Sequence, residues 1–294
     1  MERNYRIGQL FLGVVVLVWG ANFGIVKSAY QDLPPIPFAA LRFTLSGILV
    51  LIFTFWREKG LRIRKEDLGR VAAVGALGLG LYQILWSVGL NLTSATNSAL
   101  ILSTQPLIGA LYVDLIEKEP VGKRKYLNML LAFGGVTLVI LRPGAGFGLS
   151  FSTFSGDLLT LMAGFCATVF FSAWSKPLLK IYSPLRLMGY CMIISSIVLW
   201  AAALFLAQPI TLSQVGAKAW WSLGYAVVFS GIVGHVLWYD AIGRIGVTKT
   251  MVYVYFIPVW AVVFNFLLMG ERIYPQQILG GVLILLGVHR VLRT

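Results

Sequence analysis

The stretch LWSVGLNLTSATNSALILSTQPLIGALYVDLIEKE, residues 85–119, has a second copy in the same chain, LWYDAIGRIGVTKTMVYVYFIPVWAVVFNFLLMGE, residues 237–271. One constant offset of 152 residues relates the two copies, and this offset is close to half of the 294-residue chain. The residues that match at this offset include Trp86 and Trp238, Pro106 and Pro258, and Glu119 and Glu271. The sequence therefore indicates a duplicated protein whose two halves share one fold.

The composition is that of an integral membrane protein. Hydrophobic residues make up 58% of the chain, charged residues make up 12%, and the mean hydropathy is +0.83. A typical soluble domain is about 45–50% apolar and about 25% charged. The formal net charge of +13 would indicate nucleic-acid binding in a soluble protein. Beside membrane spans, basic residues instead face anionic lipid head groups, so we expect the lipid bilayer as a partner and no nucleic acid.

Ten apolar runs are long enough to cross a bilayer, which takes about 20 residues of helix. The alternating pattern of a membrane β-barrel is absent. We therefore predict an all-α membrane protein with ten transmembrane helices. The predicted spans are residues 7–27, 36–56, 68–90, 96–117, 124–141, 155–176, 184–206, 217–240, 247–268 and 275–292.

The basic residues give these spans a direction. With the N-terminus in the cytoplasm, 19 of the 24 Lys and Arg residues flank cytoplasmic span ends, and four flank the other ends. The remaining one, Arg42, falls inside the second span. Because cytoplasmic loops are enriched in Lys and Arg, we predict that both termini are cytoplasmic.

The offset carries the third and fourth spans onto the eighth and ninth, so the chain divides into two five-helix repeats, residues 1–145 and 150–294. Five is an odd number, so the second repeat crosses the membrane in the opposite direction to the first. Such a 5+5 inverted-topology repeat is typical of secondary transporters, in which the two halves exchange conformations to open a central site to one face and then the other.

Three stretches carry a resemblance to a known family: VVVLVWGANFGIVK from Val14, FAALRFTLSGILVL from Phe38, and residues 90–119 of the first copy. The sequence resembles the drug/metabolite transporter (DMT) superfamily, and within it the EamA-type ten-helix exporters of bacteria. The resemblance implies two EamA-like repeats, a central cavity, transport without ATP, and a place in the bacterial inner (plasma) membrane. Members export amino acids, other metabolites or drugs, so the resemblance leaves the substrate open.

Arg42 is the clearest candidate for substrate contact. It lies about 9 Å of helix rise into the second span, where a charged side chain is costly and is a functional candidate by default. The planar guanidinium could bind a substrate carboxylate through two parallel hydrogen bonds. Alternatively, it has a structural role, reaching the membrane surface or binding helix-end carbonyls.

His235 and Gln83 match at the offset of 152, so we predict that they face one cavity from opposite halves. His235 could transfer protons, since its reference pKa is about 6.5, or it could be a hydrogen-bonded packing residue. The 11 Asp and Glu residues all fall outside the middle of the spans. A proton-driven pump usually needs an embedded carboxylate or histidine relay, so facilitated diffusion or exchange is favoured over pumping.

Aromatic and uncharged polar residues within the spans form a second group of candidates. Aromatic faces bind apolar solutes and cations, and the amides supply hydrogen bonds, a mixture that suits a zwitterionic or amphipathic molecule. The alternative is that they hold the helices together. The predicted substrate-binding residues of this group are Trp19, Asn22, Tyr82, Trp86, Asn97, Gln105, Trp174, Tyr190, Trp238, Tyr239 and Tyr253.

Pro106 and Pro258 are predicted gating residues. Each removes a backbone donor and would interrupt its helix, the fourth span and the ninth span respectively. Their matched positions favour a shared role in conformational change.

These features predict a secondary transporter that exports a small-molecule substrate, an amino acid before other classes, and functions as a monomer. The alternative is a multidrug or cationic-solute exporter, with proton coupling as one mode. An enzyme is disfavoured because metal-ligand clusters are absent and no phosphate-binding loop occurs. We expect no cofactor and no bound metal.

Overall fold

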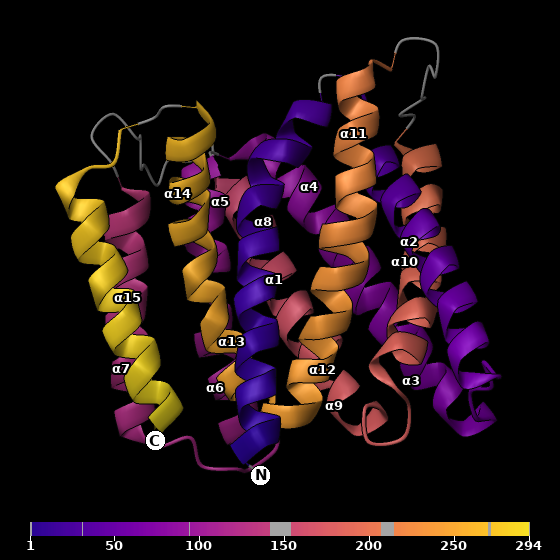
Figure 1. The fold of residues 1–294 in the computed structure, drawn as a ribbon, viewed down its shortest axis with the longest axis horizontal. Coiled ribbons are helices and arrows are strands. Elements are labelled where there is room, and N and C mark those ends of the chain that lie inside the picture. Colours follow the sequence, from indigo (N-terminus) through magenta and orange to yellow (C-terminus); the bar gives the residue numbers. More distant parts are fainter. Residues whose placement is uncertain are drawn as a thin grey trace.

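The computed structural model describes residues 2–30, 32–93, 95–141, 154–206, 215–269 and 272–293. Within these ranges the chain is helical and has no strand, and it forms ten helical spans that run side by side (Figure 1). Spans 1, 2, 5, 7 and 10 are single helices. They are α1 (Glu2–Ala29), α2 (Pro35–Glu58), α7 (Lys123–Ile140), α10 (Pro184–Phe205) and α15 (Pro275–Arg293).

The other five spans are built from consecutive helical pieces. Span 3 follows the short η1 (Lys65–Asp67) and consists of α3 (Leu68–Ala73), η2 (Val74–Leu81) and α4 (Tyr82–Leu92). Span 4 consists of α5 (Ala95–Leu102) and α6 (Gln105–Leu115). Span 6 consists of α8 (Phe154–Cys166), η3 (Ala167–Ala173) and α9 (Ser175–Leu178). Span 8 consists of α11 (Ala217–Tyr225), η5 (Ala226–Gly234) and α12 (His235–Ile245). Span 9 consists of α13 (Val247–Met251), η6 (Val252–Phe256) and α14 (Ile257–Met269).

The predicted fold class is therefore confirmed. Within the described ranges, nine of the spans are both long and apolar enough to cross a membrane. The exception is α7, whose 18 residues begin with Lys123, Arg124 and Lys125. At a rise of about 1.5 Å per residue this helix still extends about 27 Å, close to the thickness of a bilayer core. Large apolar side chains are exposed on the outside of the bundle, Trp56, Phe205 and Trp221 among them, as expected for a multi-pass membrane protein.

The packing of the spans repeats between the halves. Span 2 packs against span 7, and span 5 packs against span 10. Span 1 packs against span 8, and its counterpart, span 6, packs in the same way against span 3. Both termini lie at one end of the bundle, which we call the terminal face (Figure 1). The predicted boundary between the repeats, residues 145 to 150, lies outside the described residues.

Irregular helix also occurs at matched positions. The π-helical segments η2 and η5 begin at Val74 and Ala226, which are 152 residues apart. In span 4 a turn separates α5 from α6, and in span 9 the 3-10 helix η6 precedes α14. Pro106 and Pro258 are each the second residue of the helix that follows the break. The missing N–H of proline costs little at that position, so each proline begins a new helix where the sequence predicts an interruption.

Small residues set how closely the outer helices approach. A Cβ added to Gly135 of α7 would lie 2.6 Å from the carbonyl oxygen of Gly280, and a Cβ added to Gly280 of α15 would lie 2.5 Å from that of Gly135. The two helices therefore meet backbone to backbone, the close approach that glycine permits in membrane bundles. Gly134 and Gly281, their neighbours in sequence, have open space around the Cβ position.

Candidate functional site

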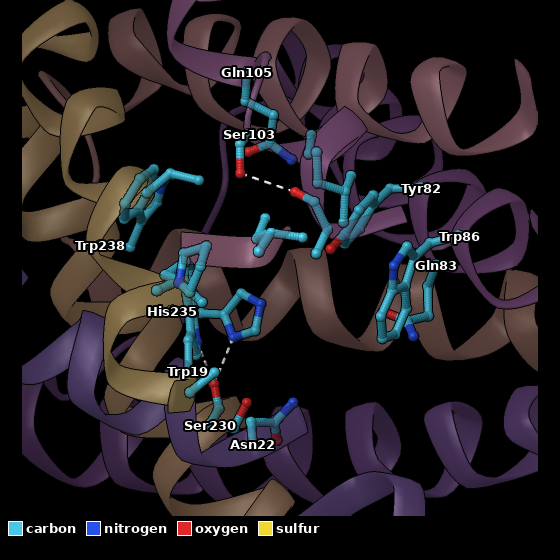
Figure 2. Close-up of a pocket in the computed structure, with 18 of the residues that line it drawn as sticks. Trp19, Asn22, Tyr82, Gln83, Trp86, Ser103, Gln105, Ser230, His235 and Trp238 are labelled. Atoms are coloured by element: carbon cyan, nitrogen blue, oxygen red, sulfur yellow. Dashed lines mark hydrogen bonds between the residues drawn. The ribbon is translucent and has the colours of Figure 1, made fainter. Parts of the chain in front are cut away.

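A cavity of about 340 Å³ lies between the two halves. It reaches the exposed side chain of Arg272 at the end of the bundle opposite the terminal face and extends inward to Ser172 and Trp238. Both repeats line it, with Tyr82, Gln83 and Trp86 of α4 on one side and spans 1 and 8 on the other (Figure 2). The cavity therefore occupies the interface that the inverted repeat creates.

Many residues predicted from the sequence are brought together here. Gln83 and His235 both line the cavity, and so do Trp86 and Trp238, so two pairs related by the 152-residue offset face the same space. The predicted residues that line the cavity are Trp19, Asn22, Arg42, Tyr82, Gln83, Trp86, Gln105, His235, Trp238 and Pro258. Substrate contact by these residues stays a prediction.

Six predicted residues lie outside the cavity lining, four of them in polar contacts or ring contacts. The Asn97 amide donates to Oδ1 of Asp157 at 3.3 Å, and the Tyr190 hydroxyl donates to the Leu61 carbonyl at 2.8 Å. The Tyr239 hydroxyl donates to the Phe171 carbonyl at 3.1 Å. The Trp174 ring contacts the ring of Phe170 edge to face, with 4.7 Å between the ring centroids.

The remaining two are Tyr253 and Pro106, which are buried in η6 and at the start of α6. All six therefore occupy positions where packing or hydrogen bonding between helices accounts for them. A gating role for Pro106 and Pro258 stays a prediction.

Arg42 is 6% exposed and lines the cavity. Its Nη2 donates to the Ser230 hydroxyl at 3.1 Å, and its guanidinium carbon lies 4.8 Å from the centroid of the Phe43 ring. Its Nε has no hydrogen-bond partner among the described residues. None of the described residues that line the cavity is Asp or Glu, whereas Arg272 is a second cation at the mouth. The cavity thus presents positive charge without a carboxylate beside it.

Ser230 connects this arginine with two aromatic residues. Its carbonyl oxygen accepts from Trp19 Nε1 at 3.3 Å and lies 2.8 Å from Nδ1 of His235. The approach of Trp19 depends on Gly234, because a Cβ there would lie 2.4 Å from Nε1 of Trp19. Ser230 is absent from the residues predicted from sequence, although it lies on the same helical span as His235.

The inner end of the cavity is closed by contacts between spans 6 and 8. Trp238 Nε1 donates to the Ser172 hydroxyl at 3.2 Å. The rings of Phe171 and Tyr239 stack with 4.7 Å between their centroids and 26° between their planes. Because the cavity ends at these residues, we call this layer the floor.

Ion pairs lie between the floor and the terminal face. Lys176 lies in span 6, two residues after Trp174. Its Nζ donates to Glu117 at 2.5 Å and lies 3.7 Å from Oε1 of Glu119. Arg186 forms two hydrogen bonds with Glu58, of 2.6 and 3.0 Å. These partners come from different spans, so the contacts hold the helices together at the end where the cavity is closed.

A hydrogen bond between loops supports the same closed end. Tyr182 precedes α10, and its hydroxyl donates to Asp67 of η1. Burial, together with this hydrogen bond, raises the pKa of the Tyr182 phenol above its ordinary value. The phenol therefore stays protonated at neutral pH and remains a donor.

The sequence matches the EamA-like transporter family twice, over residues 6–141 and over residues 154–293. The chain belongs to the EamA-like transporter family. One relative of this transporter is the uncharacterized transporter YyaM of Bacillus subtilis, 30% identical over 288 residues, which cover 97% of this chain and 93% of the relative. Another is an uncharacterized transporter of Archaeoglobus fulgidus, 28% identical over 96% of each chain.

A solved crystal structure has the same fold as this EamA-like transporter. The two superpose with a TM-score of 0.82 at 19% sequence identity, covering 96% of this chain and 94% of the other. The two matches to the family confirm the resemblance to the EamA branch that the sequence motifs indicate. The protein is a multi-pass membrane transporter.

Proposed function

We propose that this transporter moves a small metabolite with a carboxylate group, an amino acid first of all, by alternating access. The observation that carries the proposal is the buried guanidinium of Arg42, which faces the cavity and has no acidic partner among the described residues that line it. An arginine inside a membrane span costs about 2.5–3.5 kcal/mol on insertion scales. A substrate carboxylate would offset this cost through charge-assisted hydrogen bonds.

The shape of the cavity and the repeat support alternating access. The cavity reaches the surface opposite the terminal face and is closed below Trp238. If the two inverted halves exchange conformations, the floor opens and the other end closes. The ion pair between Lys176 and Glu117 would then separate in each cycle.

A multidrug or cationic-solute exporter is the second candidate, and the aromatic walls favour it. Trp19, Tyr82 and Trp238 offer ring faces to which apolar molecules and cations bind. The charge of the lining favours the first candidate, since Arg42 and Arg272 repel a cation. Facilitated diffusion or exchange is our proposed mode, because the described lining contains no Asp or Glu to form a proton relay. Proton coupling, the alternative, would run through His235, whose reference pKa is near neutral.

We further propose that the protein resides in a bacterial inner membrane with both termini in the cytoplasm, functions as a monomer and exports its substrate. The distribution of Lys and Arg among the loops supports this orientation. In that orientation the cavity described here opens away from the cytoplasm.

Counterflow in proteoliposomes tests the proposal. The vesicles are preloaded with each unlabelled amino acid in turn, and uptake of the labelled amino acid is measured beside uptake of a cationic dye, with and without a pH gradient. We expect amino-acid counterflow without a gradient and its loss in Arg42→Ala. The reverse pattern in Arg42→Ala, loss of dye transport with amino-acid flux intact, would favour the second candidate. Flux that requires the gradient would overturn the facilitator mode.

A further inference from the structure

The hydrogen bonds of His235 fix which ring nitrogen carries a proton. Nδ1 lies 2.8 Å from the carbonyl oxygen of Ser230 and 3.0 Å from that of Gly231. A carbonyl oxygen can only accept, so Nδ1 is the donor. In the neutral ring the other nitrogen, Nε2, is then an acceptor. No described residue hydrogen-bonds to Nε2, and the ring points into the cavity (Figure 2).

Asn22 supplies a second acceptor on the same wall. It lies beside Ser230 in the cavity (Figure 2), and its Oδ1 is buried without a hydrogen-bond partner in the described part of the chain. Leaving a buried polar atom unpaired costs about 1–3 kcal/mol. A ligand that donates a hydrogen bond to Oδ1 would remove this cost.

Donors stand next to these acceptors. Arg42 reaches the same wall through its hydrogen bond to the Ser230 hydroxyl, and its Nε remains a buried donor without a described partner. The wall centred on Ser230 thus offers a fixed positive charge with spare N–H groups, and beside it two spare acceptors. We call Asn22, Arg42, Ser230 and His235 the head-group wall.

An α-amino acid carries the complementary groups on one carbon atom, a carboxylate that accepts and an ammonium that donates. The opposite wall, with Tyr82 and Trp86, is aromatic and carries no formal charge (Figure 2), so it suits an uncharged side chain. The arrangement of polar and apolar groups therefore matches the two ends of such a molecule.

We propose that the head-group wall binds both charged groups of a zwitterion, the carboxylate at Arg42 and the ammonium at Asn22 Oδ1 and His235 Nε2. This inference rests on the proposed transport of carboxylates and narrows it to uncharged-side-chain α-amino acids. It predicts rejection of the matching 2-oxo acid, which lacks the ammonium, and of the matching amine, which lacks the carboxylate. A site built to hydrogen-bond a group discriminates strongly against an analogue without it, because its own polar atoms stay unpaired.

Binding to the purified full-length protein tests this, with quenching of tryptophan fluorescence as the readout, since three tryptophans line the cavity. Two matched sets serve as probes. The first is phenylalanine, 3-phenyl-2-oxopropanoate and 2-phenylethylamine, and the second is leucine, 4-methyl-2-oxopentanoate and 3-methylbutylamine. We expect the amino acid of at least one set to bind at least about tenfold more tightly than its two analogues.

Variants test which side chains cause the preference for the amino acid over its analogues. Asn22→Leu and His235→Phe should each bring the affinity for the amino acid close to that for the 2-oxo acid. Asn4→Leu, on the same helix but exposed near the terminal face, is the matched control and should leave the ratio unchanged. Asn22→Asp should strengthen amine binding and weaken 2-oxo acid binding, a gain that a misfolded protein would not show.

The outcomes separate the two proposals. Equal binding of amino acid and 2-oxo acid, both lost in Arg42→Gln, would overturn the head-group wall and leave carboxylate transport standing. Tighter binding of the amines than of either acid would overturn both proposals. Failure of phenylalanine and leucine to bind, with binding of their 2-oxo acids, would overturn the head-group wall alone. A preference for the amino acid that survives Asn22→Leu and His235→Phe would overturn the assignment of the ammonium to these residues.

Discussion

Arg42 of α2 donates from Nη2 to the hydroxyl of Ser230 in η5, 3.1 Å away, and so joins the first half of the chain to the second inside the cavity. The hydroxyl takes the place that a carboxylate would occupy in an ion pair, and no Asp or Glu among the described lining residues balances the charge of the guanidinium. A neutral partner orients the arginine without consuming its capacity to bind an anion.

Substitution of Arg42 should weaken amino-acid binding in a graded way. Arg42→Lys keeps the charge but loses the planar fork, whereas Arg42→Gln loses both. Hydrogen bonds to charged groups contribute about 1.5–3 kcal/mol each, so we expect about a 10- to 100-fold rise in Kd for Gln and a smaller rise for Lys. Arg70→Gln, at an exposed position of α3, is the control. Equal Kd values for wild type and Arg42→Gln would contradict the account.

The glycines between α7 and α15 should be needed for stability. Gly135→Ala and Gly280→Ala each place a methyl group within 2.6 Å of a backbone oxygen on the facing helix, and overpacking of this kind costs about 1–3 kcal/mol. We expect a lower midpoint of thermal unfolding in detergent for both. Gly134→Ala and Gly281→Ala meet no atom within 4 Å and should leave the midpoint unchanged or slightly higher. A uniform effect of all four would rule out the close contact as the cause.

Breaking the ion pair beneath the floor should favour opening to the terminal face. Lys176 and Glu117 are 29% and 19% exposed, and Lys176→Met removes the pair. We expect a shift of about 1 kcal/mol, or about fivefold in the population open at that face. The measurement is the labelling rate of Ser172→Cys by a membrane-impermeant thiol reagent added from the terminal face.

The control for this labelling is Arg64→Met, which breaks an exposed pair with Glu66, with a separation of 3.8 Å. It should leave the rate unchanged. If Ser172→Cys is labelled no faster with Lys176→Met than without it, the pair does not hold this end closed.

Pro106→Ala and Pro258→Ala should slow exchange more than they affect binding. Alanine restores the backbone N–H and lets helix continue through the breaks before α6 and α14. If these breaks act as hinges, counterflow slows severalfold while Kd stays the same, and the double variant is slower than either single one. An altered Kd with normal turnover would assign the prolines to the binding site instead.

Much of the architecture could be predicted because duplication and hydropathy leave periodic signals in the sequence. The offset of 152 pairs Gln83 with His235 and Trp86 with Trp238, and the members of both pairs do line one cavity. The bounds of α7, Lys123–Ile140, lie within one residue of the predicted span, 124–141, although its first turn holds three basic residues.

The sequence could not predict Ser230 as a site residue, for a physical reason. An α-helix brings residues three and four apart to one face, whereas η5 is π-helical, with hydrogen bonds that span five residues. This winding brings the Ser230 carbonyl to Nδ1 of His235, five residues later. Similarly, the sequence does not say which face of a span is turned inward, so Tyr190 and Tyr239 could not be separated from Tyr82 by composition alone.

The most direct test is an experimental structure of the protein with a transported amino acid bound, the amino acid being chosen by counterflow. We predict that the ligand lies between the head-group wall and the opposite wall with Tyr82 and Trp86, with a carboxylate oxygen about 2.7–3.2 Å from a guanidinium nitrogen of Arg42. A carboxylate directed away from Arg42, or a ligand held outside the cavity while Arg42 still contacts only Ser230, would contradict the account.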